Sequence, residues 1–93
     1  MAFQFEWDED KAASNYQKHK MTFDTAKLAF DDIFAIERVD ERFDYGEERF
    51  NILGMVGDRL ISVIYSIDNE RIRIISARGA EPHEKRRYHE AKR

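Results

Sequence analysis

The sequence contains no cysteine, a single proline, four glycines and no long hydrophobic run. Without cysteine there can be no disulfide framework, no thiolate metal site and no cysteine nucleophile. No apolar stretch approaches the roughly 20 residues that a membrane span needs. The first ten residues, MAFQFEWDED, are acidic, unlike the basic front of a signal peptide. We therefore expect a soluble, cytoplasmic protein with no membrane partner.

The chain is short, and its 93 residues leave no room for two independent cores. Apolar residues make up 42% and aromatic residues 13% of the chain, which is enough for a core although 38% of the residues are charged. No repeat, low-complexity stretch or linker rich in Pro, Gly or Ser divides it. We expect one domain over residues 1–93.

The charge is unevenly distributed along the chain, although the formal net charge is only −3. Residues 1–70 hold eight basic and sixteen acidic residues, whereas residues 71–93 hold eight basic and three acidic ones. The basic residues of this last part are Arg71, Arg73, Arg78, Lys85, Arg86, Arg87, Lys92 and Arg93. This asymmetry favours a cationic surface that can meet phosphates. A solvated basic tail without a partner is the alternative.

The first 33 residues predict a strand and two helices. Apolar and polar residues alternate over residues 3–7, which is typical of a strand with one buried face. Asp8 is a typical helix N-cap, and the helix that follows is expected to end at Lys18 or His19. Its spacing puts Lys11, Asn15 and Lys18 on one side, and Ala12, Tyr16 and His19 on another. Thr22 predicts the cap of a second, short helix. Its apolar stripe, facing a core, would be Phe23, Ala26, Phe30 and Ile33.

The remainder of the chain predicts strands and a last helix. Strands are expected over residues 34–39, 49–56, 59–67 and 70–77, with a charged loop over 40–49. Tight turns at Gly57-Asp58 and Asp68-Asn69 would make the last three strands an antiparallel meander. Pro82 suits the first turn of a final helix. The expected fold is α+β: an antiparallel sheet with two N-terminal helices and one C-terminal helix.

Arginines flank the hydrophobic strand run IISA near the C-terminus. Strict alternation puts Arg71, Arg73 and Ala77 on one face of this strand and Ser76 and Arg78 on the other. The planar guanidinium group suits phosphate because it gives two directed, charge-assisted hydrogen bonds. The alternative is that these arginines pair with carboxylates on a solvated sheet face.

His19 is the candidate for proton transfer, because an unperturbed imidazole titrates near pH ~6.5. The neighbouring Lys18 would favour its neutral form. The alternative is a helix-end histidine that satisfies the last carbonyl groups. Lys11 lies seven residues before Lys18 and could extend a phosphate track along the helix. His83 and His89 are expected to be ordinary surface residues.

Four further side chains could support such a site. Glu48 could act as a base or hold Arg49 in place. Tyr88 could stack on a base or donate a proton, and the alternative is core packing. Trp7 could be a stacking platform, although a Trp at a strand end is more often buried. The other acidic clusters lie at helix ends, where capping explains them, so no metal site is expected.

Motifs spread over nearly the whole chain match one known family. They are FEWDEDKAASNYQKH at residues 5–19, TFDTA at 22–26, GEERF at 46–50, RIRIISARGA at 71–80, and the spacing Glu84-x-x-x-Tyr88. On these residues the sequence resembles the BrnT family of bacterial toxins. It departs from the family at Lys20-Met21, where Gly-Val is common, and at Gly79, where a Lys or Arg is common.

The resemblance implies a ribonuclease toxin of a type II toxin–antitoxin pair with a compact RelE-like fold. It implies RNA as the substrate and an antitoxin of the BrnA type as the partner, with operator DNA contacted only through that antitoxin. It also favours phosphate binding for Arg73 and Arg78 over simple ion pairing.

We therefore predict a metal-independent endoribonuclease that needs no cofactor. The expected catalytic residues are His19, Arg73, Arg78, Lys18 and Glu48. The expected substrate-binding residues are Lys11, Arg49, Arg71, Ser76, Tyr88 and Trp7. The prediction requires the arginines that end the last strand to converge with the end of the first helix in one pocket.

Two other functions remain open. One is a non-catalytic interaction module that binds an antitoxin-like DNA-binding partner and acts in operon autoregulation. The other, direct DNA binding, is less favoured because no helix-turn-helix pattern precedes the basic region and the overall charge is negative.

Overall fold

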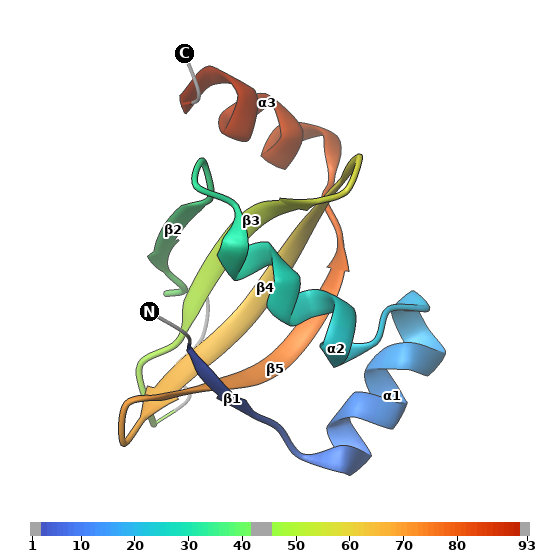
Figure 1. The fold of residues 1–93 in the computed structure, drawn as a ribbon, viewed down its shortest axis with the longest axis vertical. Helices are drawn as coiled ribbons and strands as arrows, with labels where there is room; N and C mark the ends of the chain where they lie inside the picture. Colours follow the sequence, from blue (N-terminus) through green and yellow to red (C-terminus); the bar gives the residue numbers. More distant parts are fainter. Residues whose placement is uncertain (1–2, 42–45, 92–93) are drawn as a thin grey trace.

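The computed structural model describes residues 3–41 and 46–91 and has an α+β architecture (Figure 1). Its elements, in chain order, are β1 (Gln4–Glu6), α1 (Glu9–His19), α2 (Phe23–Ala26), the 3-10 helix η1 (Lys27–Asp31), β2 (Ile36–Val39), β3 (Phe50–Val56), β4 (Arg59–Asp68), β5 (Arg71–Gly79) and α3 (Pro82–Ala91). No helix among the described residues is long and apolar enough to cross a membrane. Residues 42–45 of the expected charged loop, and Lys92 and Arg93 of the basic C-terminal group, lie outside the described residues.

The five strands form one sheet in the order β1-β5-β4-β3-β2. The antiparallel meander of β3, β4 and β5 is confirmed. However, β1 runs parallel to β5, with Gln4 opposite Arg71 and Glu6 opposite Arg73. The expectation of an antiparallel sheet is therefore wrong, and the sheet is mixed. The alternation in residues 3–7 predicted the strand, but such a pattern does not specify which strand it pairs with.

The two faces of the sheet are covered differently. On the face that Figure 1 presents, α2 and η1 cross the sheet and α1 lies beside β5. We call this the helical face; its largest core cluster contains Phe23, Val63 and Ile74. A smaller cluster, in which Tyr88 of α3 packs with Leu53 and Leu60, lies on the other face. We call that one the open face, because α3 covers only one end of it.

The predicted helix caps are confirmed. The Asp8 carboxylate accepts hydrogen bonds from the backbone N–H groups of Asp10 and Lys11, at 2.8 and 3.1 Å, and Thr22 caps α2. After α1, Lys20 has φ +56° in the left-handed region, and its N–H donates to the carbonyl of Tyr16. Glycine is the residue that this position favours, because it has no Cβ. The left-handed φ explains why glycine suits this position; Lys20 adopts the same conformation with a Cβ.

The expected apolar stripe of the second helix ends at Phe30. Ile33 was expected to face the core, but it is 88% exposed. The helical turns stop at Asp31, and the carboxylate of Asp32 accepts a hydrogen bond from the N–H of Phe34 at 2.9 Å. Because this turn breaks the helical spacing, Ile33 no longer follows the stripe.

Asn15 attaches α1 to the edge of β5. The pairing of β1 with β5 stops at Arg73, which leaves the edge at Ala77 facing α1. There the Asn15 amide donates to the Ala77 carbonyl at 2.9 Å and accepts from the Ala77 N–H at 3.0 Å. It also donates to the carbonyl of Met21 at 3.1 Å. The buried side chain thus takes the place of a neighbouring strand and fixes where α1 lies.

Candidate active site

A β-bulge sets the direction of the side chains along β5. Opposite Ile64 and Tyr65, the register shifts so that Tyr65 pairs with Ile74 but Ile64 pairs with Ser76. One residue, Ile75, is therefore extra on β5. As a result, Ile74 and Ala77 belong to the same core cluster on the helical face, although their numbers differ in parity.

This bulge corrects the expectation from strict alternation. Ala77 does not share a face with Arg71 and Arg73, because the extra residue reverses the alternation before it. The side chains on either side of the bulge instead point to the open face together: Arg71, Arg73, Ser76 and Arg78. The sheet therefore presents one row of polar and cationic side chains along β5.

A cleft of about 730 Å³ lies on the open face, between the end of β2 and the start of α3. It is lined by Arg38, Val39, Asp40, Glu41, Asn51, Ile64, Arg78, Glu81, His83 and Glu84. The strands β3 and β4 supply its floor, and the charged side chains form its walls. Its volume is in the range of ligand-binding pockets.

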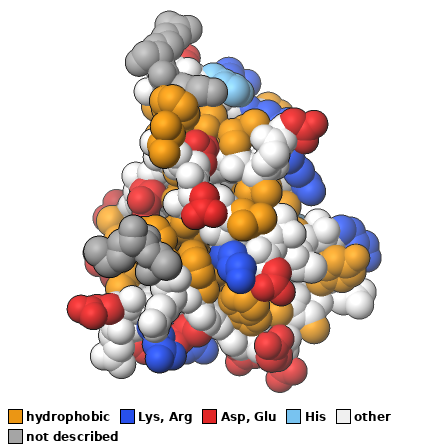
Figure 2. Space-filling model, in the orientation of Figure 1, with side chains coloured by type: hydrophobic (Ala, Val, Ile, Leu, Met, Phe, Trp, Pro, Cys, Tyr) orange, Lys and Arg blue, Asp and Glu red, His pale blue; other side chains and the backbone are white. Residues whose placement is uncertain are grey.

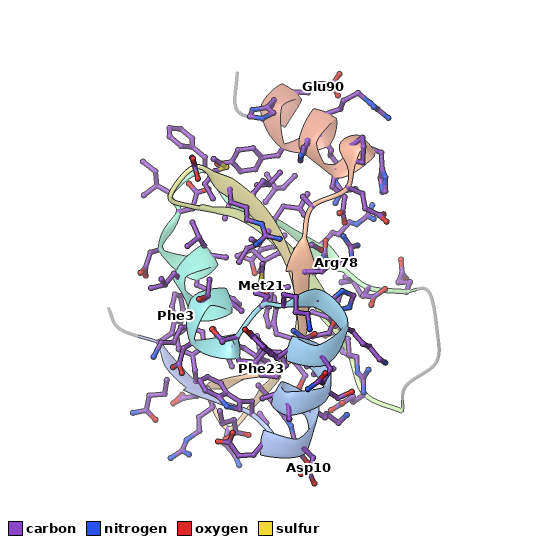
Figure 3. All side chains as sticks on the ribbon, turned by 90° about the vertical axis from the view of Figure 1, so that its right-hand side faces the viewer. Phe3, Asp10, Met21, Phe23, Arg78 and Glu90 are labelled. Atoms are coloured by element: carbon purple, nitrogen blue, oxygen red, sulfur yellow. The ribbon has the colours of Figure 1, made fainter. Side chains whose placement is uncertain are left out.

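Arg78 is held in this cleft by a two-point ion pair with Glu84. The two guanidinium nitrogens of Arg78 donate to the two carboxylate oxygens of Glu84 at 2.7 and 3.1 Å. Figure 3 shows Arg78 at the end of β5, between α3 and the C-terminal end of α1. The side chain of Arg78 is 31% exposed, whereas that of Glu84 is only 5% exposed. The ion pair therefore orients the guanidinium group and leaves part of it open to the cleft.

Glu84 is the centre of a buried polar network. Its carboxylate also accepts from the N–H of Glu81 at 2.9 Å, which caps the start of α3, and from the hydroxyl of Ser62 at 3.4 Å. Asn51 in turn donates to Ser62 at 2.8 Å. Burial alone would raise the pKa of Glu84, but the hydrogen bonds from Arg78 and Glu81 hold that pKa below its ordinary value. Glu84 is therefore a charged anchor and not a proton donor at neutral pH.

A further guanidinium group lies on the β2 side of the cleft: Arg38 of β2 lines it, opposite Asn51 in the strand pairing. Arg87 of α3 is not among the described lining residues; burial and, second, the charge of Arg38 lower the pKa of Arg87. An arginine remains charged in spite of such a shift. Phosphate in the cleft would thus meet guanidinium groups from both walls.

His83 lies in the cleft, although it was expected to be an ordinary surface residue. It follows Pro82 in the first turn of α3, and its Nδ1 lies 3.9 Å from a carboxylate oxygen of Glu81. Both side chains are more than half exposed, so both can reach a bound ligand. A carboxylate beside an imidazole can hold the orientation of the ring. The cleft thus combines guanidinium groups with an imidazole, a side chain that enzymes use as a general acid or base.

The predicted residues of α1 lie beside β5 and not in this cleft. Lys18 and His19 are exposed and come three and four residues after Asn15, on the side of α1 that faces the β5 edge. Lys11, four residues before Asn15, lies on the same side. None of these three side chains is among the described residues that line the cleft. The cleft brings Arg78 together with β2 and α3, not with the end of α1.

The other predicted residues of β5 lie along the open face. Arg73 is exposed, and Ser76 is paired with Ile64 on the floor of the cleft. Arg71 lies farther away, near Glu6, with 3.7 Å between its guanidinium and the carboxylate. These side chains share the face of β5 that Arg78 occupies.

Glu48 and Arg49 lie in the segment that leads into β3. Glu48 is exposed, and the guanidinium of Arg49 lies 3.4 Å from the carboxylate of Glu47. The carbonyl of Arg49 accepts from the N–H of Asp40 at 2.8 Å, and Asp40 lines the cleft. This segment therefore lies next to the end of β2, at the border of the cleft.

Tyr88 and Trp7 pack inside the fold. Tyr88 is 1% exposed, and its hydroxyl donates to the carboxylate of Asp32. Burial and this hydrogen bond raise the pKa of Tyr88 to about 12. Trp7 packs edge-to-face on Phe23, with 5.9 Å between the ring centroids, on the helical face. Both rings contribute to packing, and a substrate in the cleft would not reach them without a rearrangement.

A cation from β4 lies over Gly79, one of the positions where the chain departs from the family pattern. A Cβ added to Gly79 would lie 2.8 Å from a guanidinium nitrogen of Arg59. The Arg59 side chain therefore occupies the space that a side chain at position 79 would need. A cation is thus present near the end of β5 even though residue 79 is glycine.

The side chains of the cleft that sequence reasoning missed include Arg38, Asn51 and His83. Arg38 could have been found from the alternation of side chains along β2, because this alternation puts Arg38 and Glu37 on opposite faces of the sheet. His83 follows directly after a proline that begins a helix, which fixes it close to the end of β5. Among the described residues, no three His, Asp or Glu side chains are grouped so that they could hold a metal ion.

The sequence was compared with models of known protein families. A family model described as the ribonuclease toxin of a type II toxin–antitoxin system, BrnT, matches residues 7–84. The match runs from Trp7 to Glu84 and so includes α1, the strands β2 to β5 and the ion-paired carboxylate of the cleft. No curated protein matches the chain.

Proposed function

Because the chain belongs to the BrnT family of ribonuclease toxins of type II toxin–antitoxin systems, we propose that it cleaves RNA in the cytoplasm, in the cleft between β2 and α3, without a metal ion. The observation that carries this proposal is the cleft itself. It combines an oriented guanidinium group, that of Arg78, with the imidazole of His83 and a second guanidinium group, that of Arg38. The family match makes RNA the substrate.

The proposed reaction uses the 2′-hydroxyl of the RNA as the nucleophile. His83, oriented by Glu81, takes the proton as the 2′-oxygen bonds to the adjacent phosphorus. The bond from phosphorus to the 5′-oxygen breaks, and that oxygen receives a proton from water. The products are a 2′,3′-cyclic phosphate and a 5′-hydroxyl. Arg78 and Arg38 stabilise the additional negative charge of the phosphorane.

A second assignment keeps the residues suggested by the sequence. In it, Arg73 and Arg78 hold the scissile phosphate at the β5 edge, His19 and Lys18 transfer the proton, and Glu48 assists. The exposed end of α1 beside β5 supports this version. Both assignments use Arg78, and they differ in which histidine reacts. The cleft favours His83, because its imidazole and Arg78 line the same cavity.

The partner that a type II family implies is an antitoxin. We propose that it is of the BrnA type, that it alone carries the operator-binding part of the complex, and that the toxin fold is RelE-like. The negative net charge of the chain agrees with DNA binding through a partner and not by the toxin itself.

We expect the purified chain to cleave RNA equally well with excess EDTA and with added Mg²⁺, because the cleft supplies both charge stabilisation and proton transfer. The measurement is gel analysis of a labelled RNA together with end-group analysis of the products. Activity that disappears with EDTA and returns with Mg²⁺ would reject the mechanism. Induction without the antitoxin should also arrest growth; normal growth would support the non-catalytic module instead.

We expect H83A to lower kcat/KM for RNA by about 10²–10⁴-fold, which is the usual contribution of general acid–base catalysis. H19A should stay within about threefold of the wild type, since its ring lies outside the cleft. The matched control is H89A, on the same helix as His83 but outside the cleft lining. The reverse result, with H19A inactive and H83A active, would transfer the proton-transfer role to the end of α1.

A further inference from the structure

A second groove lies on the helical face, away from the cleft. It has a volume of about 390 Å³ and is bordered by η1, β2 and the turn between β4 and β5. Figure 2 presents this face, where hydrophobic side chains are interspersed with carboxylates. Three large apolar side chains of the groove are unusually exposed: Ile33 at 88%, Ile67 at 59% and Phe3 at 57%. Isolated exposed apolar residues are common, but a group of them around a groove marks an interaction surface.

The floor of the groove is aromatic and preformed. The ring of Phe30 lies edge-to-face on Phe5 and on Tyr65, with centroid distances of 5.2 and 5.0 Å. The Tyr65 hydroxyl donates to the carboxylate of Glu37, which holds the ring in place. Phe3 adds a further edge-to-face contact to Phe30 at 6.2 Å. Rings fixed in this way bind a partner without a large loss of side-chain entropy.

The charge of the groove has one sign. Asp32, Glu37 and Glu70 line it, and no Lys or Arg is among its described lining residues. This contrasts with the cleft, whose walls carry both arginines and carboxylates. A ligand for the groove therefore needs apolar groups for the floor and cations for the rim.

We propose that this groove is the docking surface for a partner segment that carries apolar side chains flanked by Lys or Arg. The identity of the partner rests on the proposed function: in a toxin–antitoxin pair, the antitoxin is the protein that supplies such a segment. RNA does not fit the groove, because its phosphates would be repelled by the carboxylates. A second copy of this chain fits less well, since both copies carry a net negative charge.

The groove and the cleft are on opposite faces but share one strand. On β2, Glu37 points into the groove and its neighbour Arg38 points into the cleft. A segment bound in the groove would therefore contact β2 without filling the cleft. Antitoxin binding and RNA cleavage are then separable by mutation.

The test measures the affinity of the separately purified antitoxin for toxin variants by calorimetry. I33D puts a carboxylate at the groove without disturbing the core, because Ile33 is 88% exposed. We expect its Kd to be at least about tenfold weaker. The matched control is L28D, at an exposed leucine of η1 outside the groove lining, which should stay within about twofold. E70K should weaken binding by about three- to tenfold, with a smaller effect at high salt.

The outcomes separate this proposal from the proposed function. If I33D still cleaves RNA but binds the antitoxin more weakly, the docking surface is supported. I33D that binds the antitoxin as tightly as L28D does overturns it, whether or not RNA is cleaved. If the wild-type chain shows no ribonuclease activity but I33D still weakens antitoxin binding, only the ribonuclease mechanism is overturned. If I33D alters only self-association in sedimentation, the groove is an interface between copies, and the proposal is wrong.

Discussion

Replacing Arg78 with alanine is expected to lower kcat/KM for RNA by at least about 100-fold, because the side chain supplies charge stabilisation where the phosphorane forms. It should also lower the free energy of unfolding. The Glu84 carboxylate would remain buried, with only 5% of its side chain exposed, but without its two-point partner. Breaking a fully buried pair costs about 3–5 kcal/mol. Because Arg78 is 31% exposed, we expect about 2–3 kcal/mol here.

A double variant separates the two effects of Arg78. In R78A/E84Q, the neutral amide can still accept from the N–H of Glu81 and no buried charge is left, so much of the lost stability should return. The activity should not return. R86A, an exposed arginine on α3, is the control and should stay within about 0.5 kcal/mol of the wild type. Urea unfolding and RNA cleavage are the two measurements. If the double variant regained activity, Arg78 would have only a structural role.

Replacing Asn15 with alanine is expected to destabilise the fold by about 3–5 kcal/mol, since each buried backbone group left without a partner costs about 1–3 kcal/mol. Three such groups lose their partner: the N–H and carbonyl of Ala77 and the carbonyl of Met21. This is a large fraction of the total stability of about 5–15 kcal/mol that is usual for a domain. Urea unfolding gives the free energy, and hydrogen exchange at the Ala77 amide gives its local component.

The controls for Asn15 use the same helix. Q17A, at an exposed position of α1, should change the stability by less than about 0.5 kcal/mol. N15D keeps an acceptor for the Ala77 N–H but directs a carboxylate at two carbonyl oxygens, so it should also destabilise the fold. A value for N15A within about 1 kcal/mol of the wild type would show that α1 is held to β5 by its other contacts.

Local signals in the sequence predicted most of the elements. The caps at Asp8 and Thr22 and the tight turns of the meander act within a few residues, so they can be read from neighbouring positions. The parallel pairing of β1 with β5 could not, because it joins residues far apart in the sequence. Asn15 shows the same limit: the helical spacing put it on the side of Lys11 and Lys18, but only the packing of α1 reveals that it is buried against Ala77.

The candidate site was predictable only in part, and the reason is again long-range. Arg78 stood out because arginines flank a strand. Its partner Glu84, by contrast, could be assigned to it only once α3 was placed over the open face. The family motifs drew attention to His19, at the end of a specific block. Whether His19 or His83 lies beside Arg78 depends on how α1 and α3 pack, which no local pattern encodes.

The extra residue at Ile75 has a consequence for how this surface can evolve. It shifts the phase of β5 by one, and thereby joins arginines from two halves of the strand into a single row. A point substitution can change the charge of one member of that row, but it cannot rotate half of the row into the protein interior. Only a deletion or insertion in this strand can do that, and it would bury guanidinium groups in the core at the same time. Substitutions can therefore change how much positive charge this row carries, but the face to which its members point stays the same.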